Sequence, residues 1–207
     1  MSRPVTGVRR GSAALAAVAT AALLLTGCGG QDTAGAQTPP GPVTQAPGAA
    51  GQAAAALERS VPQRVIIPSL GVSSELETLR QDAKGAMTTP KDPDLAGWHE
   101  PGPTPGSEGP AVIAGHVTWN GADAVFKGLK TMKAGDTVQV ARQDGKTATF
   151  TVDRVEEYPK KEFPTLEVYK NVDHAGLRLV TCGGDFDAAR HYYPNNVVVF
   201  ASMTGVA

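Results

Sequence analysis

The stretch Leu177-Arg178-Leu179-Val180-Thr181-Cys182-Gly183-Gly184 is a largely apolar run that ends on a thiol and two glycines. A short apolar run bounded by glycine predicts a buried β-strand. The chain has only two cysteines, and the other one, Cys28, lies close to the N-terminus. A free cysteine is either a small buried core residue or a reactive thiol. This stretch alone leaves both interpretations open for Cys182.

The N-terminus has the pattern of an export signal. Arg3, Arg9 and Arg10 form a basic start, and residues 13–25 form a continuous stretch of apolar and small residues. This stretch is shorter than the roughly 20 residues of a membrane-spanning helix, so it predicts a signal peptide over residues 1–27. Outside the cytoplasm an unpaired thiol tends to oxidise, which gives the presence of Cys182 a functional meaning.

The signal ends in Leu25-Thr26-Gly27-Cys28, which resembles the lipobox of bacterial lipoproteins. This motif predicts that Cys28 is lipidated and becomes the first residue of the mature protein. The alternative is ordinary cleavage near Gly27 and plain secretion. Residues 28–60 are mostly Ala, Gly, Pro and Gln and predict a disordered tether, which leaves 61–207 as one folded domain. The net charge of −1 and the lack of a basic run argue against nucleic-acid binding.

The periodicity of the folded part is mostly that of β-strands. Asp144-Gly145 is a strong tight-turn signal between two alternating runs and predicts a hairpin. Many short strands with few helices indicate a mainly β domain, either a closed barrel or a sandwich. The segments expected to be strands are 64–68, 110–116, 137–142, 147–155, 176–182 and 196–203.

Two segments do not follow the strand pattern. A helix is expected near 123–132, because Asp123 can cap it and apolar residues recur at helical spacing. Its apolar stripe, which we expect to face the core, consists of Phe126, Leu129 and Met132. Residues 90–110 are rich in Pro and Gly and are expected to form a loop.

Three residue types in this domain suit acyl transfer. Cys182 can act as a nucleophile when a nearby cation favours its thiolate. His116, which closes the apolar run 110–116, can protonate a leaving amine. Arg190 is the only arginine after Cys182, and its guanidinium can hold an oxyanion. Residue types alone remain weak support, because a lone histidine on an apolar strand is more often a structural group.

The ordered set of motifs from residue 61 onward resembles the sortase family, closest to class F with class E as the neighbour. The first strand is similar at Pro62-Gln63-Arg64-Val65-Ile66-Ile67-Pro68, and the histidine motif at Ile113-Ala114-Gly115-His116-Val117. The nucleophile motif L-x-T-C is matched by Leu179-Val180-Thr181-Cys182. The loop before the histidine and the closing strand are similar at Gly97-Trp98-His99, Pro105-Gly106-Ser107-Glu108-Gly109, Tyr193 and Asn195-Asn196-Val197-Val198-Val199. Arg178 and Pro194 depart from the pattern, since that group often has Thr and a polar or basic residue there.

This resemblance implies an eight-stranded sortase-type β-barrel with one or two short helices, and a cysteine transpeptidase and endopeptidase without cofactor or metal. The implied catalytic residues are His116, Cys182 and Arg190, and the implied substrate-binding residues are Thr181 and Trp119. Cys182 would cleave an LPxTG-like sorting signal of secreted proteins and form a thioacyl enzyme. An amine on a peptidoglycan precursor or another envelope component would then resolve it. The expected place of action is the extracytoplasmic face of the cell membrane, with the lipid on Cys28 as anchor.

Three other functions would show different features in the sequence. An L,D-transpeptidase would carry a histidine just before its cysteine, and a papain-like peptidase would place its cysteine before its histidine. A non-catalytic envelope lipoprotein would leave Cys182 inert. The remaining histidines, His99, His174 and His191, are expected at the surface or in turns; the alternative for His99 is a place at the border of the substrate groove.

Overall fold

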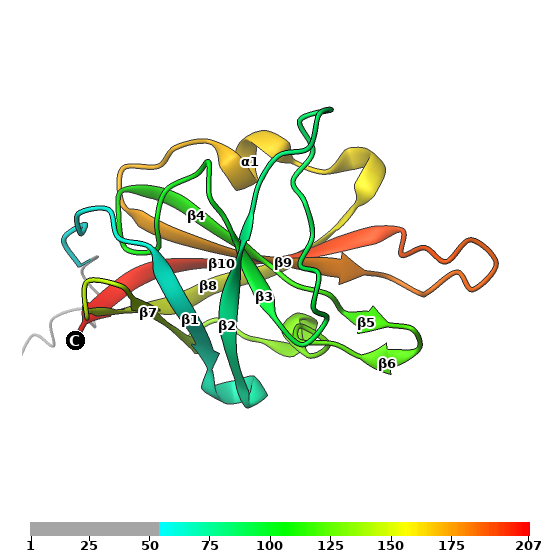
Figure 1. Cartoon of the computed structure of the whole chain (residues 1–207), viewed down its shortest axis with the longest axis horizontal. Coiled ribbons are helices and arrows are strands. Elements are labelled where there is room, and N and C mark those ends of the chain that lie inside the picture. The colour runs from blue at the N-terminus through cyan, green and yellow to red at the C-terminus, as the bar shows by residue number, and fades with distance from the viewer. Residues whose placement is uncertain (1–53) are drawn as a thin grey trace, which may run out of the picture. The chain divides into compact units, whose positions relative to one another are not determined.

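A computed structural model describes residues 54–207, and in this part the chain forms a closed barrel of eight strands (Figure 1). The strand order around the barrel is β1-β2-β3-β4-β9-β10-β8-β7, and a separate two-stranded ribbon consists of β5 and β6. The prediction of a mainly β, eight-stranded barrel with few helices is therefore confirmed. The predicted signal peptide, the lipidation at Cys28 and the tether up to residue 53 lie outside the described residues.

The elements follow one another with short connections. The helical pieces are a single α-helical turn, α1 (Thr165–Tyr169), and three 3₁₀ turns, η1 (Pro68–Leu70), η2 (Leu129–Thr131) and η3 (Lys160–Glu162). The strands are β1 (Pro62–Ile67), β2 (Val72–Leu79), β3 (Ala96–His99), β4 (Gly109–Ala114), β5 (Thr118–Trp119), β6 (Ala122–Asp123), β7 (Thr137–Arg142), β8 (Thr147–Pro159), β9 (Ala175–Gly183) and β10 (Asn195–Val206).

The barrel interior is filled by alternate residues of the strands, as the period of two in a β-strand requires. Val65 and Ile67 of β1, Val138 and Val140 of β7, and Leu177 of β9 are each fully buried in one cluster. The expected hairpin forms between β7 and β8, with the turn at Asp144-Gly145. The interior thus fixes the register of the strands that end at the candidate site.

β4 and β9 are also buried on their outer faces. A second apolar cluster outside the barrel includes Val112 of β4, Val180 of β9 and Phe200 of β10, and Val168 of α1 packs into it. In Figure 1, α1 lies above β4 on this side of the barrel. Arg178 shares this face, where its guanidinium lies 4.7 Å from the Phe200 ring and is almost fully buried. Burial on both faces explains why β4 and β9 read as continuous apolar runs rather than alternating ones.

The prediction of a helix at 123–132 is wrong, because only η2 and the short strand β6 form there. Tertiary backbone bonds replace the helical ones: Val125 N–H donates to Pro93 O, and Phe126 N–H donates to His116 O. The apolar stripe nevertheless faces the core as predicted, with Phe126, Leu129 and Met132 all buried. Packing therefore places these three side chains in the core, although the backbone that carries them does not form an α-helix.

The loop expected at 90–110 is interrupted by β3, which pairs in parallel with β2 and antiparallel with β4. Position 97 of this strand is a glycine because a Cβ there would meet the Leu79 side chain at 2.5 Å. A Gly in a strand often marks such a close approach, and this is why β-propensity alone did not find β3.

Residues 54–60, which the sequence assigned to the tether, lie against the barrel. Ala54 N–H donates to Met203 O at 3.1 Å, and Leu57 N–H donates to Gly106 O at 2.7 Å. Leu57 also packs against the apolar core.

Arg142 at the end of β7 holds this N-terminal segment in place. Its side chain is fully buried and forms an ion pair with Asp144 at 2.9 Å. The guanidinium also donates to the backbone oxygens of Pro105 and Glu58. The single guanidinium group of Arg142 thereby joins the hairpin turn, the loop before β4 and the segment that precedes β1.

We predict that Arg142→Met lowers the free energy of unfolding by about 3 kcal/mol, because two backbone oxygens and a carboxylate lose their buried donor. Urea unfolding followed by circular dichroism measures the change. Arg64→Ala is the control, since the Arg64–Glu75 ion pair lies at the surface and should contribute less than about 1 kcal/mol. Equal effects of the two substitutions would contradict the role given to Arg142.

Candidate active site

The candidate site is created by the parallel pairing of β4 and β9. Ala114 lies opposite Val180 at the end of their shared register. His116 and Cys182 each follow two residues later, so both return to the same side of the sheet at the same level. Two residues that are 66 positions apart in the chain are thereby brought to one edge of the barrel.

Hydrogen bonds fix this edge beyond the last paired residues. Gly115 N–H donates to Val180 O at 3.1 Å, and the Thr181 hydroxyl donates to Gly115 O at 2.8 Å. Thr181, predicted to bind substrate, thus ties the two strand ends together with its hydroxyl. Its side chain is almost fully buried, although the residue lines the cavities beside Cys182.

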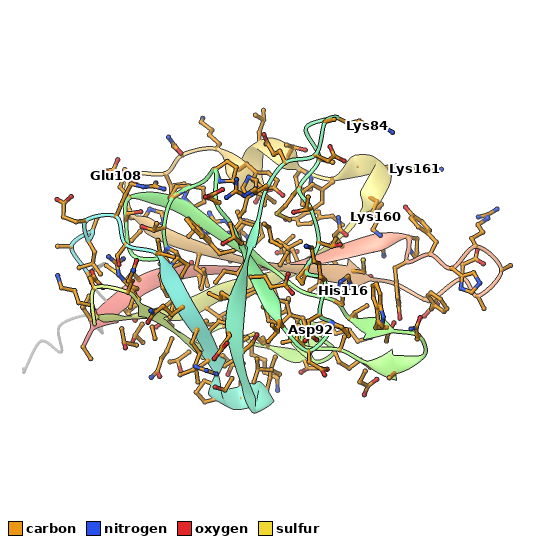
Figure 2. The ribbon with its side chains drawn as sticks, in the orientation of Figure 1. Lys84, Asp92, Glu108, His116, Lys160 and Lys161 are labelled. Atoms are coloured by element: carbon orange, nitrogen blue, oxygen red, sulfur yellow. The ribbon has the colours of Figure 1, made fainter. Side chains whose placement is uncertain are left out.

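His116 and Cys182 line a common groove of about 860 Å³ on the outer face of the barrel. Its floor includes Val112, Ala114 and Val180 from β4 and β9. Residues from the segment between β2 and β3 form one part of its lining, and residues from η3 to α1 form another. The side chains contributed by these two segments include Met87, Pro90, Phe163 and Tyr169. In Figure 2, His116 is labelled in the same half of the barrel as Lys160, toward the end from which the β9–β10 loop extends.

The imidazole of His116 is half-buried and has a defined orientation. Its Nε2 lies 2.9 Å from Pro90 O. A carbonyl oxygen only accepts, so Nε2 carries the hydrogen and Nδ1 is the nitrogen that is left to exchange a proton. The ring of Trp119 lies 4.8 Å from the imidazole, between centroids, and is 45% exposed. Trp119 of β5 therefore shields one side of His116.

Cys182 is half-buried and lies between two cavities. Besides the large groove it lines a smaller cavity of about 200 Å³, together with Lys127, Asp185 and Tyr193. The Sγ atom accepts a hydrogen bond from the Nζ of Lys160 at 3.4 Å. No signal in the sequence singles out Lys160, because its contact with Cys182 spans β10, which lies between β8 and β9 in the barrel.

Arg190 lies in the loop between β9 and β10, away from the sulfur environment just described. Its side chain is 80% exposed and pairs with Asp187 at 3.6 Å. Asp187 Oδ1 also accepts from the backbone N–H of Arg190, which forms a local turn. This loop is joined to the β5–β6 ribbon where the hydroxyls of Tyr193 and Thr118 lie 2.7 Å apart. In Figure 1 the loop and the ribbon extend from the same end of the barrel.

The expectation of a surface or turn position is wrong for His99. It is the last residue of β3, only 7% exposed, and it lines the large groove next to Tyr169. Its Nδ1 is buried and has no hydrogen-bond partner among residues 54–207. Burial lowers the pKa of His99 below its usual value. The expectation holds for His174 and His191, which lie in turns.

Within residues 54–207, no group of three or more His, Cys, Asp or Glu side chains is arranged to bind a metal ion. In the same range, no helix has the length and apolar character needed to cross a membrane.

The comparisons with known proteins agree with this geometry. The family model for the sortase domain matches residues 65–204. Among solved structures, a pilus-related sortase C of Group B Streptococcus is similar with a TM-score of 0.54 and 16% identity, over 72% of this chain and 69% of that one. Sortase C-1 from Actinomyces oris has a TM-score of 0.52 and 20% identity, over 69% and 73% of the two chains.

A lid mutant of sortase A from Corynebacterium diphtheriae is similar with a TM-score of 0.53 and 18% identity, over 72% of this chain and 73% of that one. At these identities the likeness concerns the fold. A search of curated protein sequences found no match.

We predict that acidification destabilises the protein partly through His99. Its lowered folded-state pKa means that the unfolded chain binds a proton first, so stability is full above about pH 6.5 and falls as the pH drops below it. In His99→Gln the loss of stability between pH 7.5 and pH 5 should be smaller, as measured by urea midpoints across that range. His191→Gln, in an exposed turn, is the control. An unchanged pH dependence in His99→Gln would contradict the prediction.

Proposed function

The chain belongs to the sortase family of cysteine transpeptidases, and we propose that Cys182, His116 and Arg190 are its catalytic residues. The proposed reaction cleaves a C-terminal sorting signal of secreted proteins and transfers them, through a thioacyl enzyme, to an amine of the cell envelope. The observation that carries this proposal is the common groove of about 860 Å³ that His116 and Cys182 line at the paired ends of β4 and β9.

In the first half of the reaction, the thiolate of Cys182 attacks the carbonyl carbon before the scissile peptide bond. The S–C bond forms, and the C–N bond breaks when the tetrahedral intermediate collapses. The leaving nitrogen takes a proton from the imidazolium of His116. Nδ1 suits this transfer, because Nε2–H is already bonded to Pro90 O.

In the second half, an acceptor amine attacks the thioester and gives its surplus proton to the neutral imidazole. The new C–N bond forms, and the thiolate of Cys182 leaves. Water can take the place of the amine, which would give the protein a slow endopeptidase activity. The smaller cavity beside Cys182 offers the acceptor a route that does not pass through the groove holding the sorting signal.

The large groove suits an extended peptide with small apolar side chains. Its volume is in the range of about 300–1,000 Å³ that is common for ligand pockets, and its floor is apolar. An LPxTG-like signal fits this chemistry. In this proposal Thr181 binds the signal at the floor of the groove. Trp119, whose ring contacts His116, borders one end of the groove. The L-x-T-C motif at 179–182 and the closing strand motif support assignment to class F, with class E as the alternative.

The place of action follows from the family and from the N-terminal motif. Sortases are enzymes of the cell envelope, and the lipobox-like Leu25-Thr26-Gly27-Cys28 supports a lipid anchor on Cys28. Two acyl chains or more would hold the mature protein stably at the extracytoplasmic face of the membrane. The acceptor would then be a peptidoglycan precursor or another amine-bearing component of the same layer.

The alternative of a non-catalytic envelope lipoprotein gives no reason for a thiol to line two cavities at once. An L,D-transpeptidase-like acyl transferase is disfavoured because its histidine would precede the cysteine directly in the chain. Here the imidazole comes from the chain just after β4, 66 residues before the cysteine.

We predict that Cys182→Ala removes all transpeptidation without loss of the fold, because the covalent step needs the sulfur. His116→Ala should lower the rate about 10²- to 10⁴-fold, since the leaving amine loses its acid. The assay incubates the full-length protein in detergent with a library of pentapeptide signals and an amine acceptor, and mass spectrometry identifies the products.

His174→Ala, which removes a histidine from a turn outside both cavities beside Cys182, is the matched control and should keep the wild-type rate. Product formation by Cys182→Ala would overturn the proposed mechanism, and a wild-type rate in His116→Ala would make that histidine structural.

We also predict that Arg190 acts on the transition state, where its guanidinium donates hydrogen bonds to the oxyanion. For this the loop between β9 and β10 moves toward the groove. Arg190→Ala should lower kcat about 10²- to 10³-fold and raise KM less. Arg190→Lys should recover little, because lysine lacks the planar fork. Steady-state kinetics on the peptide found by the library test both variants, with Arg64→Ala as the control. Near-normal kcat in Arg190→Ala would remove this arginine from the catalytic site.

A further inference from the structure

Lys160 contacts the candidate nucleophile, although no sequence motif marks it. It is the first residue after β8, and its Nζ donates to the Sγ of Cys182 at 3.4 Å. Within residues 54–207 this is the hydrogen bond that the sulfur accepts. A sulfur that receives a charged donor is more stable as thiolate than one in an apolar pocket.

The position of Lys160 follows from the strand order at this end of the barrel. Asn195 of β10 pairs with Pro159 of β8 on one side and with Gly183 of β9 on the other. Two strand spacings, about 10 Å, therefore separate the backbones of Lys160 and Cys182, a span that a lysine side chain covers in large part. The backbone N–H of Lys160 donates to Pro194 O at 2.9 Å, which fixes the start of η3.

The ammonium group is also held from the loop side. It lies 4.5 Å from the centroid of the Tyr192 ring, a favourable cation–π position. The next residue, Lys161, differs in environment although it shares the 3₁₀ turn: it is exposed, and Figure 2 shows it extending away from the molecule. The half-buried position of Lys160 is therefore specific to that residue rather than a property of the turn.

Among the charged groups near the sulfur, Lys160 is the cation that donates to it. Lys127 and Asp185 line the smaller cavity with Cys182, but Lys127 is paired with Asp123 at 2.7 Å. Arg190 is paired with Asp187 and 80% exposed. Glu157 of β8 accepts from the Asn195 amide at 2.7 Å. Lys160 itself forms no salt bridge with any described residue. Its charge is thus available to the sulfur and is not neutralised by an acid.

We propose that Lys160 is a further catalytic residue, whose ammonium stabilises the thiolate of Cys182 before the attack and again when the thiolate leaves. This inference rests on the proposed role of Cys182 as nucleophile. Lys160 acts at the sulfur, whereas the role proposed for Arg190 is at the oxygen of the tetrahedral intermediate. No proton needs to leave Lys160 at any step.

The test measures alkylation of Cys182 by iodoacetamide and peptide turnover in the full-length protein in detergent. In Lys160→Met, which keeps the length but removes the charge, both rates at neutral pH should fall about tenfold. The rise of the alkylation rate with pH should move to higher pH, while the plateau at high pH should stay near that of the wild type. Lys160→Arg should restore most of both rates, and Lys161→Met, the matched control, should equal the wild type.

Three outcomes would overturn the role of Lys160. The first is wild-type alkylation and turnover in Lys160→Met. The second is an equal loss of rate at every pH, which would indicate a structural role. The third is a stable acyl group on Lys160 found by mass spectrometry after reaction with peptide, which would make the residue a neutral acceptor amine. The control Cys182→Ala separates these results from a failure of the proposed function, because only that failure would leave Cys182→Ala active.

Discussion

The parallel pairing of β4 with β9 is the constraint on which the site depends. Ala114 and Val180 are the last partners of this pairing, so the residues two positions beyond them, His116 and Cys182, reach the same edge of the barrel together. A slip by one residue in either strand would turn its reactive side chain to the opposite face. The register is held because both strands are buried on both faces, in the barrel interior and under α1. The apolar interior of the barrel thereby determines the geometry of the polar site.

Tight packing continues right up to the two reactive residues. A Cβ at Gly115, just before His116, would meet Phe126 at 2.7 Å, and a Cβ at Gly183, just after Cys182, would meet Val197 at 2.8 Å. These glycines permit close packing, whereas Gly184, with a φ of +79°, is the point at which the chain turns away from the strand. The Cys182 side chain is therefore placed by the end of β9, and the irregular backbone of the following loop begins at Gly184.

The sequence was sufficient for the features that depend on local pattern and failed for those that depend on contacts between distant segments. The β7–β8 hairpin, the apolar runs of β4 and β9 and the inward stripe of Phe126 could all be predicted from periodicity and turn chemistry. β3 could not be predicted in this way, because the reason for a glycine at position 97 is the close approach of the Leu79 side chain from another strand. His99 was misplaced for the same reason, since its burial follows from that strand. Lys160 carries no local signal at all, because its partner is set by the order of three strands around the barrel.

The two positive groups at this end of the barrel, Lys160 and Arg190, differ in how firmly the structure holds them. The backbone of Lys160 is bound to Pro194 and its ammonium lies on Tyr192, so its charge is in place before any substrate arrives. Arg190 lies in an exposed turn organised by Asp187, so its guanidinium would have to move to take the role proposed for it at a substrate oxygen. A fixed cation suits the proposed thiolate, which must form before the attack, because it needs no reorganisation. A mobile one suits the oxyanion, which exists only after the carbonyl has been attacked. Division of the two charges between a rigid strand end and a loop therefore matches the order in which negative charge appears during acyl transfer.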